Sequence, residues 1–428
     1  MTFFLALTLG LLFFFTCRKH KFILFYAPFS VMLQPWMCIR YSAPALTVSF
    51  AINFVLTIFL LLKRKHAAKN NPFSKVVVLM ILGNLIGLLS SQDNIILSLP
   101  DFMQKVCAYT PLVLLYDEIR TEKDLEIILK FFVWVAITLL VYGFLEFILQ
   151  KNPLLLYATS GISEKYIMGK IYYSEEGIIR FGSIRCQSLM TISIAWGALC
   201  AIFFGVVVSI KNYLKHFFNK SILHLIILLS IIGCLSAGSR SPYVFFVIIF
   251  LPFFLKNFST KEKIFCLIIF FIALIYTMPT INSIVKSFSS QSDVSGSSAE
   301  MRIKQFETII MAMKDNFIFG IGNKGVHYIT SKYSNAYGAE SIWFQSFITT
   351  GVCGVTLQIL QYYQSFKTIV RNVNRTRGIE MRFFLLGWIA FSTLTTSPGL
   401  SYVYFLIIIT IIMKCDIIRS TTLNQRGL

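Results

Sequence analysis

Four arginines lie where long apolar runs give way to polar connections, at Arg180, Arg185, Arg240 and Arg302. A guanidinium group keeps its charge and presents paired N–H donors whose geometry matches the oxygens of a phosphate. An arginine near a helix end can also extend its head group to lipid phosphates at the membrane surface. The four arginines are therefore candidate anion-binding groups. The elements around them determine whether they form an anion-binding site or contact lipid phosphates.

Arg240 lies in the stretch CLSAGSRSPY, between the apolar runs SILHLIILLSIIG and VFFVIIFLPFFL. Small residues precede Arg240 and Pro242 follows it, so the sequence predicts a helix break at membrane depth. Backbone groups freed by such a break must be buried in protein or line a wet cavity. Polar interruptions of this kind commonly mark substrate sites. Lipid contact alone therefore explains Arg240 less well than it explains the other three arginines.

Three polar features accompany the arginines. The stretch FIFGIGNKGVHY has Gly320 and Gly322, which permit a tight turn and leave backbone N–H groups open to an anion or a hydroxyl, and His327 lies nearby. No strand precedes these glycines and no Gly-Lys-Ser/Thr follows, so they form neither a dinucleotide fingerprint nor a phosphate loop. Glu340 stands at the mouth of the next apolar run. Glu146, in GFLEFILQ, is interpreted as a paired structural group.

The composition identifies the elements that must hold these residues. Of the 428 residues, 56% are hydrophobic and only 14% are charged, with a mean hydropathy of +0.72. Apolar runs of roughly twenty residues cross a bilayer as helices. We predict an all-α, polytopic integral membrane bundle of about 11–13 transmembrane helices, and the first apolar run is interpreted as a retained anchor. The candidate spans are 2–16, 22–40, 43–62, 76–92, 103–116, 128–150, 186–209, 221–238, 242–255, 264–281, 340–363, 383–397 and 399–413.

The formal net charge of +20 does not indicate nucleic acid, because the basic residues gather at the ends of the predicted spans on one side. Cytoplasmic loops carry an excess of Lys and Arg, so this side is predicted to be cytoplasmic, with the N-terminus outside and the C-terminus inside. The assignment needs the weak span at 103–116, which contains Lys105, to cross the membrane. The clusters lie at 18–21, 63–75, 211–220, 256–263, 367–382 and 414–426.

Two connections, 151–185 and 282–339, are too long to be simple turns. In the second, EMRIKQFETIIMAM places Ile303, Phe306, Ile310 and Met313 at helical spacing. We expect an amphipathic helix that lies on the membrane or roofs the bundle. The predicted organisation is therefore transmembrane helices over 1–150, a first outer loop over 151–185, helices with the Ser-Arg break over 186–281, a large outer loop over 282–339, and C-terminal helices with a tail over 340–428.

Residues 180 to 355 resemble the bacterial O-antigen polymerase and O-antigen ligase superfamily. LSAGSRSPYVFF resembles its Ser-Arg helix break, and RFGSIRCQSLMTISIAW resembles its Arg-x-Gly segment that enters a span. MRIKQFETIIMAMKDNFIFGIG resembles the outer-loop stretch, and ESIWFQSFITTGVCGV resembles the helix that follows it. The motifs occur in the expected order around the large loop.

The resemblance implies a glycosyltransferase of the bacterial inner membrane whose active site faces the periplasm. Its donor and acceptor would be oligosaccharides on undecaprenyl diphosphate, in contact with membrane lipids, and a chain-length regulator protein would be a further partner. Ligases typically begin the helix after the large loop with His-Asn, whereas this chain has Glu340-Ser341. That departure favours a polymerase of lipopolysaccharide biosynthesis, with ligase as the alternative.

On this hypothesis Arg240 and Arg302 are catalytic, because they stabilise the charge that develops on the departing lipid diphosphate. Glu340 is catalytic as a base or as an orienting acceptor for the attacking hydroxyl. Arg180 and Arg185 are predicted to bind substrate, and so are Gly320, Gly322 and His327. The region has no Asp-x-Asp motif of the kind that holds Mg²⁺ with a nucleotide sugar, so we predict no metal and no cofactor.

A flippase or secondary transporter of lipid-linked oligosaccharides is the alternative outside the enzyme class. Such a protein would also have many spans and arginines in a cavity, but it usually shows repeated halves and short outer loops. The sequence has no evident internal repeat, and the loop at 282–339 is long. An enzyme is therefore the favoured interpretation, although the polysaccharide it builds can be an O-antigen, a capsule or another surface glycan.

Overall fold

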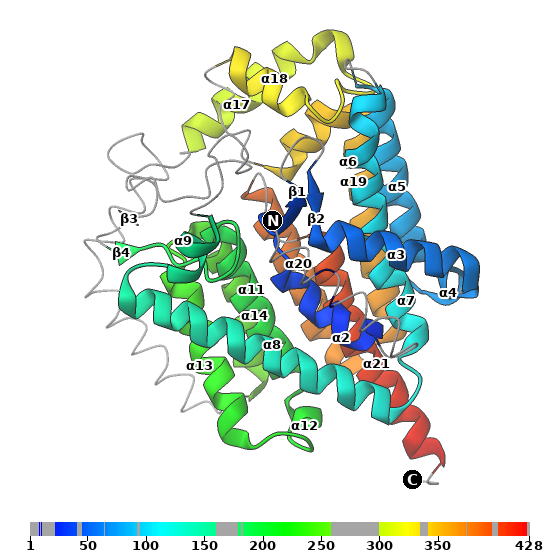
Figure 1. The fold of residues 1–428 in the computed structure, drawn as a ribbon, viewed down its shortest axis with the longest axis vertical. Coiled ribbons are helices and arrows are strands. Elements are labelled where there is room, and N and C mark those ends of the chain that lie inside the picture. The colour runs from blue at the N-terminus through cyan, green and yellow to red at the C-terminus, as the bar shows by residue number, and fades with distance from the viewer. Residues whose placement is uncertain are drawn as a thin grey trace.

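The computed structural model describes residues 8, 10, 22–40, 45–63, 65–91, 95–159, 179–180, 183–257, 299–333, 341–373, 375–395 and 401–425. These residues are mostly helical, which confirms the all-α prediction (Figure 1). The predicted span at 264–281 lies outside the described residues, and of the predicted span at 2–16 only residues 8 and 10 are described. Within the described part of the chain, two helices, Glu122–Leu149 and Ile342–Asn372, are long and apolar enough to cross a membrane by themselves, and several shorter apolar helices accompany them.

The N-terminal elements run from residue 22 to residue 149. They are α2 (Phe22–Phe29), η1 (Ser30–Met32), β1 (Cys38–Arg40), β2 (Leu46–Thr47), α3 (Val48–Lys63), α4 (Lys65–Asn70), α5 (Ser74–Leu89), α6 (Ile95–Cys107), α7 (Thr110–Glu118) and α8 (Glu122–Leu149). A capping box starts α8, because Thr121 Oγ1 accepts from the Asp124 N–H while Asp124 Oδ2 accepts from the Thr121 N–H, both at 3.2 Å.

The middle elements are α9 (Pro153–Thr159), β3 (Ile179–Arg180), β4 (Ser183–Ile184), α11 (Ser193–Ser209), α12 (Lys211–Leu214), α13 (Lys220–Ser236) and α14 (Arg240–Asn257). The C-terminal elements are α17 (Ala299–Ala312), η2 (Lys314–Asn316), α18 (Gly325–Lys332), α19 (Ile342–Asn372), α20 (Arg375–Thr393) and α21 (Tyr402–Gln425). The strands form two antiparallel hairpins, β1 with β2 and β3 with β4.

Two predicted spans do not form single helices. The run at 22–40 is helical only to Met32, because Pro35 cannot continue the helix, and a hairpin follows. The indole N–H of Trp36 then donates to the Leu189 carbonyl (3.1 Å), which fixes this turn to the segment before α11. The run at 103–116 is divided between α6 and α7, with Pro111 in the first turn of α7. The two helices together replace the single predicted crossing.

The helix α11 forms the centre of one half of the bundle, and nearly all of its side chains are buried. Glycines let its neighbours approach closely, as expected for helices that pack in a membrane. A Cβ at Gly197 would lie 2.7 Å from Pro242 Cβ, and one at Gly205 would lie 2.5 Å from the Phe384 ring. These contacts tie α11 to α14 and α20.

The helix α20 joins the two halves, since it packs against α14 on one side and α19 on the other (Figure 1). Phe245 of α14 stacks on Phe391 of α20, with ring centroids 5.7 Å apart. In the other half, α5 and α19 pack side by side. The helices α17 and α18 lie at one end of the bundle, opposite the end where α21 finishes (Figure 1). We call the end with α17 and α18 the loop end.

Candidate active site

The break predicted before Arg240 is present. The helix α13 ends at Ser236, Gly238 has a positive φ of 58°, and α14 begins at Arg240. The break frees backbone carbonyls at the end of α13, and the N–H of Cys186 donates to one of them, at Ser236 (2.9 Å). The segment 183–192 therefore fills the break, and Arg240 lies half-buried at the start of the second helix.

Arg185 lies directly against this break. Its guanidinium donates to Ser239 Oγ and, through Nε, to the Ala237 carbonyl (3.5 Å). Its side chain also packs on Gly238, where an added Cβ would lie 3.0 Å from Arg185 Cγ. The structure thus brings Arg185 and the three residues that precede Arg240 into one cluster.

Glu146 supports the same cluster from α8. Its carboxylate is buried and accepts the backbone N–H groups of Gln187 (3.1 Å) and Ser188 (2.6 Å). Ser188 has a positive φ of 51°, so the carboxylate holds a turn that few non-glycine residues adopt. These contacts agree with the interpretation of Glu146 as a structural rather than a catalytic group. Its effect is to fix the segment that carries Arg185.

Arg302 lies on α17 and is half-buried, and its Nη2 donates to the Leu394 carbonyl (3.1 Å) just beyond α20. The helices α14 and α20 run antiparallel, since Phe245 meets Phe391 while Ile249 and Phe384 meet at Gly205. Arg240, at the start of α14, and Leu394, at the end of α20, therefore face the same end of the bundle. Arg185, Arg240 and Arg302 all belong to the loop end.

The helix predicted around Arg302 is present, but its buried face differs from the prediction. Gln305, Ile309 and Met313 are buried, whereas Ile303 and Phe306 are 59% and 53% exposed. Of the predicted apolar stripe, Met313 faces the protein interior, whereas Ile303, Phe306 and Ile310 are exposed, as expected if that side of the helix faces the membrane. The buried face instead includes a polar residue, and it continues from Arg302.

The glycine turn makes contacts that the sequence did not predict. The N–H groups of Gly320 and Gly322 donate to the carbonyls of Asn316 (2.9 Å) and Thr349 (3.0 Å). The expectation that these N–H groups stay open to a ligand is therefore wrong. Gly320 pairs within its own turn, whereas Gly322 pairs with a carbonyl freed by a kink in α19 at Gly351, where φ is 64° and ψ is −159°. The turn fastens the outer loop to the kink.

The structure describes the other predicted site residues only in part. Arg180 lies in β3, whose backbone pairs with β4, and its side chain lies outside the described residues. Glu340 also lies outside the described residues, one position before Ser341, which caps α19 by accepting the Trp343 N–H (3.3 Å). His327 is exposed on α18.

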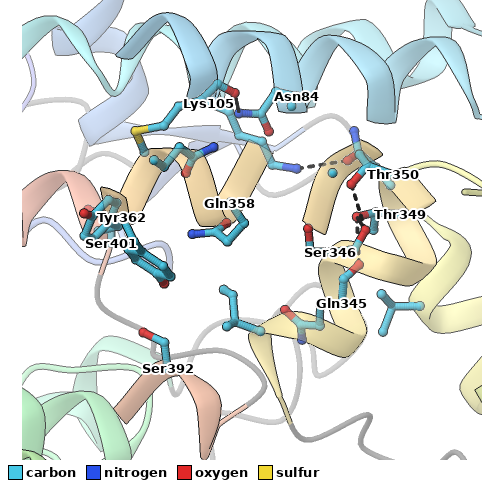
Figure 2. Close-up of a pocket in the computed structure, with 18 of the residues that line it drawn as sticks. Asn84, Lys105, Gln345, Ser346, Thr349, Thr350, Gln358, Tyr362, Ser392 and Ser401 are labelled. Atoms are coloured by element: carbon cyan, nitrogen blue, oxygen red, sulfur yellow. Dashed lines mark hydrogen bonds between the residues drawn. The ribbon is translucent and has the colours of Figure 1, made fainter. Parts of the chain in front are cut away.

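A polar cavity of about 860 Å³ lies inside the bundle between α5, α6, α19 and α20, and we call it the amide cavity. Figure 2 shows Gln358 extending into the space bounded by Gln345, Tyr362 and Ser392. A second cavity of about 290 Å³ adjoins it, and the two share Pro35, Lys105 and Ser401. Lys105 therefore lies between two cavities, where it contacts Asp101 (2.9 Å) and Asn323 (3.3 Å).

The amide cavity was not predicted from the sequence, although a signal was present in α19. Thr350, Gly354, Gln358 and Gln361 recur every three or four residues, which places small and polar groups along one face of an otherwise apolar helix. Polar groups at membrane depth face a bundle interior or a wet cavity. The stripe on α19 therefore indicated a cavity beside that helix.

The fold and these sites together define a class of protein. An all-α bundle of apolar helices, with a broken helix, arginines at one end and an interior cavity, is a polytopic membrane protein. A family model described as O-Antigen ligase matches residues 225–359. This segment, which runs from α13 through the outer loop into α19, is similar to that family. No curated protein matches the chain.

The match confirms the family resemblance drawn from the sequence. The family consists of membrane enzymes that transfer glycans in the biosynthesis of lipopolysaccharide and related polysaccharides. The matched segment contains Arg240, Arg302, the glycine turn and most of the α19 wall of the amide cavity. The candidate site and the matched segment therefore overlap in the chain.

Proposed function

We propose that this protein is an O-antigen polymerase that extends a glycan carried on undecaprenyl diphosphate. The observation that carries the proposal is the family match over 225–359, within which Arg240 and Arg302 belong to the same end of the bundle. Arg185, which precedes the matched segment, lies against the break at Arg240. Three guanidinium groups at one end suit a substrate with a diphosphate.

In the proposed reaction a hydroxyl of the acceptor sugar attacks the anomeric carbon of the donor glycan. A new C–O bond forms as the bond between that carbon and the diphosphate oxygen breaks, and the electron pair leaves with the lipid diphosphate. Arg240 and Arg302 take up the negative charge that develops there. Glu340 accepts or orients the proton of the attacking hydroxyl. Arg180 and Arg185 hold the diphosphate of the acceptor lipid.

The reaction uses an activated leaving group, so the proposed mechanism needs no nucleotide, metal or other cofactor. The proposed location is the bacterial inner membrane, with the loop end facing the periplasm, because the basic clusters predict the opposite end to be cytoplasmic. A chain-length regulator protein is a proposed partner.

Polymerase is favoured over ligase by Glu340-Ser341, which stands where ligases typically have His-Asn. Ligase is the second candidate, because the matching family model is described as O-Antigen ligase. Gel analysis of lipopolysaccharide from a strain that lacks the gene separates the candidates. A polymerase predicts loss of long chains while single-repeat lipopolysaccharide persists. Loss of all O-glycan from lipid A core would instead identify a ligase, and accumulation of cytoplasm-facing lipid-linked units would identify a flippase.

A further inference from the structure

The amide cavity is lined mainly by uncharged groups that form hydrogen bonds. Among the described residues that line it, Lys105 is the one charged side chain. Burying amides and hydroxyls within a membrane bundle is costly unless they have partners, so this lining suits a ligand rich in hydroxyl groups. The uncharged polar side chains include Gln345, Ser346, Gln358, Gln361 and Ser392.

One wall of the cavity is aromatic. Trp388 stacks on Tyr402 with centroids 5.9 Å apart, and Tyr362 meets Tyr402 edge-on at 5.3 Å. All three side chains line the cavity, and their mutual packing fixes their orientation. A pyranose ring has an apolar C–H face that packs on an aromatic ring and equatorial hydroxyls that reach amides at its edge. Aromatic rings and glutamines that line one cavity therefore match a sugar.

At the rim of the cavity, the side-chain amide of Asn323 has an N–H donor without an acceptor among the described residues. Asn323 Oδ1 accepts from Lys105 Nζ (3.3 Å), whereas Asn323 Nδ2 is buried and has no hydrogen-bond partner among the residues that the structure describes. A buried polar group without a partner is costly, and it is commonly completed by a ligand or water. Asn323 lines the cavity on the side of the outer loop.

The amide cavity lies close to Arg302. Ser392 lines the cavity, and Leu394, two residues further on, accepts the hydrogen bond from Arg302. Ile309 of α17 and Ile348 of α19 belong to one apolar cluster, so the helix that carries Arg302 packs on a wall of the cavity. A glycan in the cavity would therefore lie next to the group that is transferred.

We propose that the amide cavity binds the oligosaccharide of the lipid-linked acceptor, and that the sugars it takes are uncharged. This inference rests on the proposed function, because that function supplies the acceptor. The volume of about 860 Å³ lies in the upper part of the range for small-molecule sites, roughly 300–1,000 Å³. The pair of Lys105 with Asp101 (2.9 Å) balances the charge at the rim, so the cavity offers no net charge to a sugar carboxylate or amine.

The test uses the purified full-length protein in lipid nanodiscs with Gln358→Leu and Gln361→Leu. Gln364→Leu is the matched control, since Gln364 lies on the same helix and is absent from the described lining of the cavity. Kinetics are measured against the single-repeat acceptor. Each cavity variant should raise the acceptor KM roughly 3- to 10-fold, as expected for one lost hydrogen bond, with kcat changed less than about twofold. The control should retain the wild-type KM.

A binding measurement separates this inference from the proposed function. Undecaprenyl diphosphate carrying one repeat unit is compared with the same lipid without sugar. The cavity variants should weaken binding of the glycosylated lipid only. An unchanged affinity and KM in both variants, or equal loss for both lipids, would overturn the inference. If the wild-type protein binds the glycosylated lipid through these glutamines but extends no chain, the inference stands and the polymerase proposal fails.

Discussion

The guanidinium group of Arg185 donates to the hydroxyl of Ser239, one residue before α14 begins at Arg240. The same group reaches the carbonyl oxygen of Ala237 (3.5 Å), so it satisfies polar groups that the helix break exposes. An arginine distant in sequence thereby becomes part of the structure around Arg240. Binding and folding are linked here, because the side chain proposed to hold a diphosphate also completes the break.

Replacing Arg185 with methionine should lower both stability and activity. The hydroxyl of Ser239 loses its donor, and the carbonyl of Ala237 keeps only the Ser239 hydroxyl (3.2 Å), which costs about 1–3 kcal/mol when such groups remain buried. Thermal unfolding in detergent and chain extension should both be measured. Arg120→Met is the control, since Arg120 makes an exposed ion pair with Asp117 (2.9 Å) and such pairs contribute little. Equal melting temperatures for the two variants would contradict the role assigned to Arg185.

Gly351→Ala should destabilise the junction between the outer loop and α19. Its φ of 64° and ψ of −159° lie in a region almost confined to glycine, and an added Cβ would lie 2.3 Å from the Ile318 carbonyl oxygen. The expected cost is about 1–3 kcal/mol in the free energy of unfolding. For comparison, a Cβ at Gly83 meets nothing closer than 3.9 Å, so Gly83→Ala should unfold at nearly the wild-type temperature. A Gly351→Ala protein as stable as Gly83→Ala would show that the kink tolerates a side chain.

Glu340→Gln should reduce the transfer rate by roughly 10²- to 10⁴-fold if the carboxylate accepts the proton, because glutamine is isosteric but is a poor base. The rate is measured with purified lipid-linked donor and acceptor. Glu307→Gln, an exposed position on α17, is the matched control and should retain the wild-type rate. An unaltered rate in Glu340→Gln would remove this residue from the chemistry.

Treatment with EDTA should leave the transfer rate unchanged. The leaving group is an activated lipid diphosphate, and the proposed charge stabilisation comes from arginines rather than from a divalent ion. The assay compares the purified enzyme before and after exhaustive chelation, with Mg²⁺ restored in a parallel sample. Loss of activity that Mg²⁺ restores would show that a metal takes part.

Much of the fold followed from hydropathy, because each apolar run needs a helix to satisfy its backbone in lipid. The break before Arg240 and the helix around Arg302 were also predictable, from small residues beside a proline and from helical spacing. The turn after Met32 was not, since its position depends on the distant contact of Trp36 with Leu189 (3.1 Å). Local apolarity carries no information about such a contact.

The candidate site was predictable in its residue types but not in its contacts. Arginines at polar junctions were evident, yet nothing local predicted that Arg185 would pack on Gly238 or that Arg302 would reach Leu394. The glycine turn was interpreted as open because two of its partners, the Ile348 and Thr349 carbonyls beside the kink at Gly351, lie in another part of the chain. The polar stripe on α19 was visible in the sequence, and only its enclosure by α5, α6 and α20 needed the structure.

The most direct test of the arginine site is chain extension by Arg240→Ala and Arg302→Ala, assayed with purified protein and lipid-linked repeat units. Lys304→Ala serves as the control, because Lys304 is an exposed cation on the same helix as Arg302. The account predicts that both arginine variants enter the membrane normally but extend chains at least ~10²-fold more slowly, while the control matches the wild type. Chains of wild-type length and rate from either arginine variant would contradict it.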